Sequence, residues 1–393
     1  MHLLKTALIC AMPLMLAAAS RAEDVADLLN ASAPLDTIHT QRTDVPTIGP
    51  EGQYTTGQDG GTVPVQDNPL CSANMGPTLS ITTEILLWKL ENAVNQPVAV
   101  DLYSLTTRLT TADMGFGYQP GMKTDVKYLS PEEDSAFEIV YYGIYEWTDN
   151  REIDSPPNPG GPGNVRLPAN FGNFNGTAYS NPPTAAQLEA GTHDWATADS
   201  MTFRNQATFN SVEANLVWGG QKTNSGVMFG PRYLGLYESF RMQAFSSYIN
   251  GANPPPSVYN ISTRNDLLGA QVGYFYRQKS DCWDNYFYFK GALYGNNCRQ
   301  DTFVTDDASG VVLRNFSPSA SITASSLEAG LSGARRINKT WLLRFGYDAI
   351  WVQDVARATD QLDFTTNPTA GSTLQFRQGA LMHGGNIGFE ARY

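Results

Sequence analysis

The last thirteen residues constrain the fold of this chain more than any other segment. From Leu381 to Tyr393 the odd-numbered positions are largely apolar, and the even-numbered positions are largely small, polar or charged. A period of two places successive side chains on opposite faces, which is typical of a β-strand and not of a helix. The segment therefore predicts a strand with one apolar face and one polar face.

The aromatic residue that closes this strand adds a second signal. An alternating strand that ends in Tyr or Phe resembles the C-terminal signature of outer-membrane β-barrels, in which residues alternate between lipid and lumen. Here the signature residues are Ile387, Phe389 and Tyr393. We therefore expect contact with outer-membrane lipid, and recognition of this strand by the barrel-insertion machinery.

Residues 1–22 predict a secretory signal peptide and hence export. Lys5 supplies positive charge, an apolar run extends from Ala7 to Ala19, and small residues precede the expected cleavage after Ala22. The alternative is an uncleaved N-terminal anchor, which the short apolar run disfavours. The predicted location is the bacterial outer membrane.

The composition favours a membrane barrel over a soluble domain. Charged residues make up 16% of the chain, against about 25% in soluble domains. Aromatic residues make up 11%, and barrels use them in girdles at both membrane interfaces. The net charge of −12 argues against binding nucleic acid through a basic surface. Secreted β-sandwiches can share this composition.

Two zones follow the signal peptide in the predicted organisation. Residues 23–76 are irregular, either a flexible periplasmic segment or a plug in the lumen, and residues 77–393 form the barrel. Within the barrel, the Pro-, Gly- and Asn-rich residues 148–199 predict a long external loop. The predicted strands are Leu79–Leu90, Gly121–Leu129, Ala136–Trp147, Met201–Trp218, Gly226–Phe240, Leu267–Arg277, Asn285–Asn296, Ser321–Ile337, Thr340–Val355, Leu374–Gly379 and the terminal strand.

The strand count is expected to be even. Weak strands in 91–120 and 300–318 would bring the total to roughly 10–14. The fold class is therefore all-β, a single antiparallel transmembrane β-barrel with an irregular N-terminal segment.

Charged side chains orient the strands, because Arg or Lys on the lipid face at the bilayer midplane costs about 2–4 kcal/mol. In Trp341–Val352 the alternation places Trp341 and its odd-numbered neighbours toward lipid. A soluble β-sandwich would invert the faces and bury Arg344, Asp348 and Glu390 in a core. The residues predicted to line the lumen are Gln271, Lys290, Glu328, Arg344, Asp348, Glu390 and Arg392.

Cys71, Cys282 and Cys298 remain after removal of the signal peptide. Cys282 and Cys298 flank a predicted strand, whose ends lie tens of ångströms apart at ~3.3 Å per residue. That separation is too large for a disulfide. A Cys282–Cys298 bond would therefore contradict the strand assignment.

Four segments carry a family resemblance: Phe209–Leu216, Gly230–Glu238, Asn265–Gly273 and His383–Tyr393. In this order they resemble the putative beta-barrel porin seven family, over roughly residues 79–393. The resemblance implies an outer-membrane barrel and supplies no substrate and no catalytic residue.

Sequence motifs for catalysis or cofactor binding are not found, and neither an enzyme nor a cofactor is expected. The sequence holds no P-loop, no GxSxG and no dinucleotide fingerprint. His39, His193 and His383 show no spacing that points to a triad or a zinc site. A barrel-embedded enzyme is disfavoured because His383 falls on the predicted lipid face.

The sequence thus predicts a porin-like passive pore, open to small solutes, or a structural component of the envelope. The alternative is a secreted β-sandwich that acts as a binding protein or adhesin.

Overall fold

The structure is a computed structural model, and ten segments of the chain are described. The predicted signal peptide, the segment 23–76 predicted to be irregular, His39 and Cys71 lie outside them. The described residues are 79–91, 95–130, 134–156, 163–168, 193–220, 223–246, 255–280, 282–306, 311–365 and 369–393.

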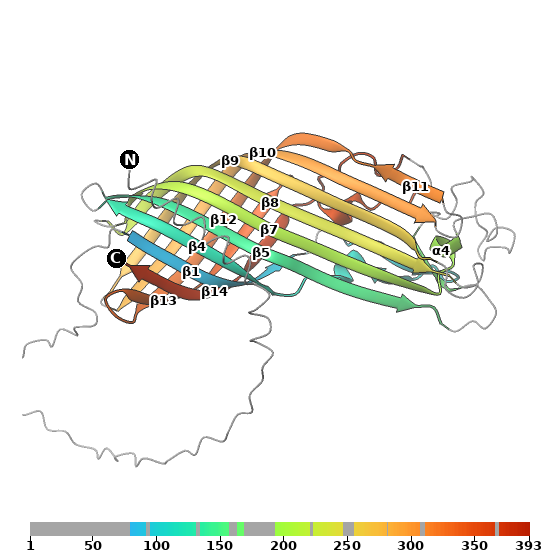
Figure 1. Cartoon of the computed structure of the whole chain (residues 1–393), viewed down its shortest axis with the longest axis horizontal. Coiled ribbons are helices and arrows are strands. Elements are labelled where there is room, and N and C mark those ends of the chain that lie inside the picture. The colour runs from blue at the N-terminus through green and yellow to red at the C-terminus, as the bar shows by residue number, and fades with distance from the viewer. Residues whose placement is uncertain are drawn as a thin grey trace, which may run out of the picture. The chain divides into compact units, whose positions relative to one another are not determined.

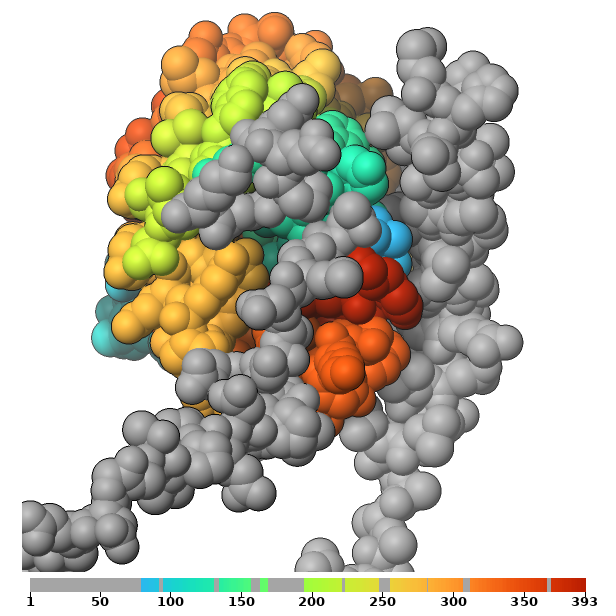
Figure 2. Space-filling model, turned by 90° about the vertical axis from the view of Figure 1, so that its left-hand side faces the viewer, coloured from blue at the N-terminus to red at the C-terminus, as the bar shows by residue number. Residues whose placement is uncertain are grey.

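Ten antiparallel strands of the described chain close into a barrel (Figure 1). Each strand pairs with the next, and the circle closes between the last strand and the first, with Ser80 opposite Arg392 and Leu90 opposite Met382. In Figure 2 the red C-terminal strand lies beside the blue first strand. The ten strands are β1 (Leu79–Leu90), β4 (Gln119–Ser130), β5 (Ser135–Asp154), β7 (Ser200–Gly219), β8 (Ser225–Phe245), β9 (Ser257–Lys279), β10 (Trp283–Asp306), β12 (Ser319–Arg336), β13 (Trp341–Gln353) and β14 (Ala380–Arg392).

Closure confirms the predicted all-β barrel and rules out the β-sandwich alternative. A sandwich needs two stacked sheets with free edges, whereas the barrel strands form one continuous ring.

The alternating pattern gives the barrel an apolar outside and a mixed inside. On β13 the side chains of Trp341, Phe345 and Trp351 are exposed, while Asp348 is 1% exposed. The predicted orientation of this strand is therefore confirmed. The same alternation on β9 exposes Leu268 and its even-numbered neighbours down to Tyr276. This outward surface is the lipid-facing band.

Half of the wall is taller than the membrane requires. A membrane strand needs about 9–11 residues, yet β5, β7, β8, β9 and β10 have 20 to 24. They run past the band on one side (Figure 1, right) and form, with β11 (Val311–Phe316), a part that we call the extension.

Two predictions on strand boundaries are wrong. Residues 148–154, assigned to the long loop 148–199, belong to β5, where they pair with β7. Leu374–Gly379 is not a strand. The place beside β13 is occupied by β14 itself, so a further strand has no edge to join there.

A small core fills the extension. The short strands β2 (Pro97–Asp101), β3 (Thr107–Thr110) and β6 (Val165–Arg166) form a separate sheet. Three one-turn helices join this sheet: η1 (Thr111–Asp113), α4 (His193–Ala196) and η2 (Ala358–Gln361). Together with inward side chains of the barrel strands, these elements contribute to one buried hydrophobic cluster. The cluster includes Val98, Leu109, Met114, Val165, Trp195, Phe203, Phe240, Tyr259, Leu362 and Phe364. The weak strands predicted in 91–120 and 300–318 are therefore present, but β2 and β3 belong to the separate small sheet and are not strands of the barrel wall.

No helix in the described segments is long and apolar enough to cross a membrane.

The cysteines agree with the strand assignment. Cys298 is a free, buried thiol inside β10, whereas Cys282 is disulfide-bonded. A Cys282–Cys298 bond is thus excluded.

Candidate functional site: the barrel interior

The interior is stacked in layers, and the order can be followed along the inward positions of one strand. On β8, Arg232 is followed by Leu234 and Leu236, then by Glu238, and then by Phe240 in the extension. Because inward side chains recur every second residue, each of these steps is about 7 Å farther along the strand. We describe the layers in this order.

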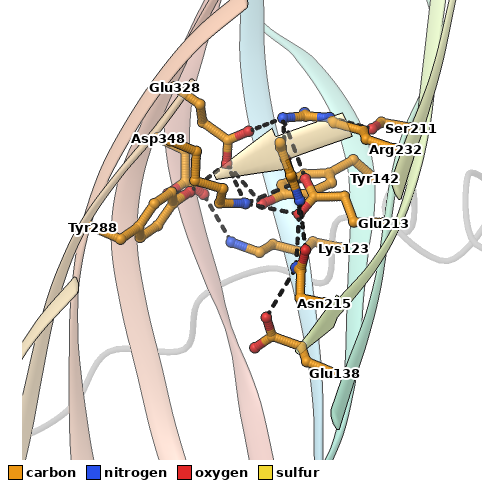
Figure 3. Close-up of polar contacts among 12 residues, drawn as sticks. Lys123, Glu138, Tyr142, Ser211, Glu213, Asn215, Arg232, Tyr288, Glu328 and Asp348 are labelled. Atoms are coloured by element: carbon orange, nitrogen blue, oxygen red, sulfur yellow. Dashed lines mark hydrogen bonds and ion pairs between the residues drawn. The ribbon is translucent and has the colours of Figure 1, made fainter. Parts of the chain in front are cut away.

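A network of charged and polar side chains, the charged layer, fills the part of the barrel on the side of the short turns, which connect β9 with β10 and β12 with β13. Figure 3 shows these side chains converging from facing walls. The charged layer comprises Lys123, Glu138, Tyr142, Ser211, Glu213, Asn215, Arg232, Gln271, Tyr288, Lys290, Glu328 and Asp348.

Arg232 is at the centre of this layer, and its side chain is fully buried. Its Nη1 lies 2.6 Å from Glu328 Oε2 and 3.4 Å from Glu213 Oε1. Its Nε donates to Ser211 Oγ at 3.0 Å. Lys290 contacts the same two carboxylates, Glu213 at 2.9 Å and Glu328 at 3.0 Å. Two cations thus share two buried carboxylates, so each charge keeps an opposite charge within contact.

Tyrosine hydroxyls and a second lysine connect the rest of the layer. The Tyr288 hydroxyl oxygen lies 2.9 Å from Glu328 Oε1 and 2.8 Å from Asp348 Oδ1, within hydrogen-bond distance of both carboxylates. Lys123 Nζ lies 3.1 Å from Asp348 Oδ2. These bonds tie β10, β12, β13 and β4 together across the interior of the barrel.

A smaller group of ion pairs closes the end of the barrel beside the short turns. Arg344 Nη1 lies 2.6 Å from Glu390 Oε2, and Arg392 Nε lies 2.5 Å from Glu390 Oε1. Arg392 also reaches Asp284 at 2.8 Å. The three strands β13, β14 and β10 are thereby joined inside the wall.

The apolar layer lies between the charged layer and the extension. The indole N–H of Trp147 donates to the carbonyl of Trp88 at 3.0 Å, and the rings of Trp88 and Phe209 stack 6.3 Å apart. The residues of this layer are each at most 3% exposed. They are Leu86, Trp88, Phe116, Trp147, Phe209, Leu234, Leu236, Leu267, Tyr294, Ile350 and Met382.

The chain after β13 folds back over the apolar layer, and we call residues 354–365 the docked segment. It begins at Asp354, whose φ of +58° turns the chain. Ala356 exchanges two hydrogen bonds of 2.8 Å with the side chain of Asn265. Arg357 pairs with Glu238, which also accepts from the Ala358 N–H at 2.9 Å.

The described interior leaves little free volume at the charged layer. A cavity of about 50 Å³ lies among Glu84, Lys123, Glu138, Tyr288 and Asp348. That space suits a few water molecules, since about 10–15 Å³ of such cavity space holds one water. Among the described residues, no three His, Cys, Asp or Glu side chains are grouped to hold a metal ion.

The structure places all seven predicted lumen residues on inward faces. Gln271, Lys290, Glu328 and Asp348 meet in the charged layer, while Arg344, Glu390 and Arg392 form the group beside the short turns. The signature residues Ile387, Phe389 and Tyr393 are more than half exposed on the outside.

Sequence reasoning missed the central cation and one of its acids. Arg232 and Glu213 were not among the predicted lumen residues, although both sit at inward positions of alternating strands. Applying the charge rule to β7 and β8, as to β13, would have found them.

Comparison with protein families gives one match, to the family described as Putative beta barrel porin-7, over residues 197–393, half of the chain. The chain belongs to this family. It is therefore an outer-membrane β-barrel protein of a bacterium, as the resemblance predicted. No curated protein matches the chain.

Solved structures similar to this barrel are remote. The outer membrane protease OmpT from Escherichia coli has 10% identity and a TM-score of 0.40, covering 80% of this chain and 96% of its own. A major outer membrane protein from Thermus thermophilus has 10% identity and a TM-score of 0.26, covering 80% and 99%. The toluene transporter TodX from Pseudomonas putida has 8% identity and a TM-score of 0.23, covering 83% and 70%.

Proposed function

We propose that this member of the porin-7 family is a closed structural barrel that anchors its extension on the outer face of the membrane and acts without catalysis. The single observation that carries the proposal is the apolar layer. Trp88, Phe209 and Leu234 are at most 1% exposed in the middle of the barrel. An aqueous pore needs a polar path at this level, because ions cross apolar surroundings at high cost.

Barrel size supports the same proposal. In a barrel of about eight strands, side chains just fill the interior, while the 16–18 strands of general porins leave an aqueous channel. A barrel of ten strands is closer in size to the eight-stranded barrels, and here large side chains occupy its interior.

The proposed orientation follows from the two ends of the wall. Outer-membrane barrels have short periplasmic turns and longer external loops. The turns between β12 and β13 and between β9 and β10 are short, and they lie at the end opposite the extension. The extension would then face outward, and the C-terminal strand would meet the insertion machinery at the periplasmic end.

Ion conductance of the purified protein in planar bilayers tests the proposal, with a general porin as the positive control. The wild-type protein is expected to give no steady open-channel current. The double variant Trp88→Ala/Phe209→Ala, which empties part of the apolar layer, is expected to leak. The matched control Trp341→Ala/Phe345→Ala removes two aromatic side chains from the lipid face and is expected to stay silent. Long-lived channels from the wild-type protein would refute the closed barrel.

A second candidate is a gated passage for small solutes. It is favoured by the docked segment, which is part of a connection between strands and contacts Glu238 and Asn265 through polar bonds. In that case Glu238→Gln/Asn265→Ala would release the segment and produce current. A closed barrel predicts no current from this variant, since the apolar layer remains in place.

A further inference from the structure

A groove of about 510 Å³, bordered by polar and aromatic side chains, crosses the outer face of the tall wall, outside the barrel interior. It spans β5, β7, β8, β9 and β10. Its lining includes Tyr145, Glu146, Gln206, Tyr237, Arg264 and Asp301. The closed-barrel proposal assigns no role to this surface.

A β-bulge in β5 shapes one end of the groove. Ile144 pairs with Phe209 and Trp147 with Ala207, so the two residues Tyr145 and Glu146 lie opposite a single residue of β7, Thr208. Both of their side chains are exposed, although adjacent residues of a regular strand would point to opposite faces. Bulges re-aim side chains in this way and are over-represented beside active sites. The bulge therefore presents an aromatic ring and a carboxylate side by side.

The height of the groove matches the lipid headgroups. On β9, Arg264 lines the groove, and the exposed Leu268 that begins the lipid-facing band follows four residues later. Four residues of strand span about 13 Å. Because barrel strands tilt by about 35–45°, the distance along the membrane normal is about 10 Å. The groove thus opens just above the hydrocarbon.

Charges in and around the groove are balanced within it. Arg264 pairs with Asp266 at 2.5 Å, and Arg299 pairs with Asp301 at 2.9 Å. Glu146 accepts a hydrogen bond from Gln206 and lies 3.8 Å from Arg204. The surface therefore offers many donors and acceptors without a net positive charge. It suits a ligand rich in hydroxyl groups better than a polyanion.

Two aromatic rings complete the lining. Tyr145 is 47% exposed, and the Arg264 guanidinium lies 5.0 Å from the centre of the Tyr237 ring. Flat aromatic faces bordered by carboxylate, amide and guanidinium groups bind the apolar faces and the hydroxyl groups of sugar rings. We propose that this groove binds the sugar headgroup of an outer-leaflet glycolipid. The proposal rests on the outward orientation of the extension.

Binding of the full-length protein to defined vesicles tests this assignment. The probe is phosphatidylcholine vesicles with and without a lipopolysaccharide that carries core sugars. We expect binding to the sugar-bearing vesicles, weakened roughly tenfold by Tyr145→Ala and by Arg264→Gln, a loss equal to about 1.4 kcal/mol. The matched control Arg241→Gln changes an exposed arginine on β8 outside the groove and should bind like the wild type. Equal binding to sugar-free vesicles, or variants that bind normally, would overturn the proposal.

A second arm separates the source of the sugar. The lipid-free core oligosaccharide is offered to the same variants, and the proposal predicts weaker binding than to the intact glycolipid. Equal affinity for the free oligosaccharide would contradict the claim that the bound sugar belongs to a glycolipid. The outward orientation of the extension is checked separately, by labelling on intact cells of an Asn315→Cys variant in β11. A failure of the orientation can therefore be distinguished from a failure of sugar binding.

Discussion

At the scale of single residues, the charged layer depends on Arg232. It is buried among Glu213 and Glu328, and Lys290 is the other cation in contact with both acids. Buried ion pairs add little net stability, but removing one partner leaves an uncompensated charge. The arginine is therefore tolerated only together with its two acids.

Arg232→Ala should lower the free energy of unfolding by about 3–5 kcal/mol, because two buried carboxylates would share one lysine. The measurement is the urea midpoint of unfolding of the barrel in detergent, with the gel mobility of unboiled samples as the readout. Arg264→Ala is the matched control, since its exposed pair with Asp266 is worth at most about 1 kcal/mol. A loss no larger than that of the control would show that the network does not stabilise the barrel.

Asp360 makes the docked segment sensitive to pH. The carboxyl is 2% exposed, and this burial, partly offset by the nearby Arg357 guanidinium, raises its pKa from 3.8 to about 6. A raised carboxyl pKa means that the docked state binds the proton more tightly than the open state. Docking therefore strengthens as the pH falls from about 7 toward 4, and weakens as the pH rises through 6.

Hydrogen exchange of the amides of residues 355–364 should consequently be slower at pH 5 than at pH 7.5, after correction for the intrinsic exchange rate. Asp360→Asn should remove this pH dependence and favour docking at pH 7.5 by about 1–3 kcal/mol. If wild-type protection rises with pH instead, the buried carboxylate is stabilised in its ionised form and the assignment is wrong.

At the scale of elements, the alternation on β13 and β14 could be predicted in detail, because charge on a lipid-facing position is costly and fixes the face. Asp348 and Glu390 point inward as expected. The extension could not be predicted, since outside the lipid a strand loses this constraint. Residues 148–154 carry charges on both faces, so no alternation separates them from the Pro-, Gly- and Asn-rich residues that follow and that predict a loop.

The docked segment was missed for a related reason. Its contacts are between residues far apart in sequence, such as Arg357 with Glu238, and local periodicity contains no information about them. The same holds for the contact of Arg232 with Glu328, which lies on β12, 96 residues later in the chain.

The failed strand prediction at Leu374–Gly379 gives a test at this scale. Ile387→Pro removes an N–H inside β14, which is paired on both sides, and should prevent folding into a heat-modifiable barrel. Thr373→Pro lies beside the wrongly predicted strand, in a region without regular structure, and should leave the gel mobility unchanged. A severe defect from Thr373→Pro would imply that this region is paired after all.

At the scale of the whole described molecule, one continuous ring of hydrogen bonds explains why so polar an interior is stable in a membrane. Every strand of the ring has two neighbours, so lipid meets no open sheet edge. The layers inside the ring differ in how they stabilise it. Ion pairs cross-link the wall near the short turns, and apolar side chains fill the middle of the barrel. The family match fixes the location, and the filled interior motivates the closed-barrel proposal.

The uneven height of the wall has a consequence for how such a protein can change. The terminal strand β14 and its neighbours β13 and β1 are short, with 13, 13 and 12 residues, while the residues farthest from the bilayer come from β5 to β10. In the proposed outward orientation of the extension, substitutions that alter what the cell surface displays therefore fall on strands other than the one that bears the aromatic terminus. The sequence of the extension can thus vary without changing the strand that directs assembly.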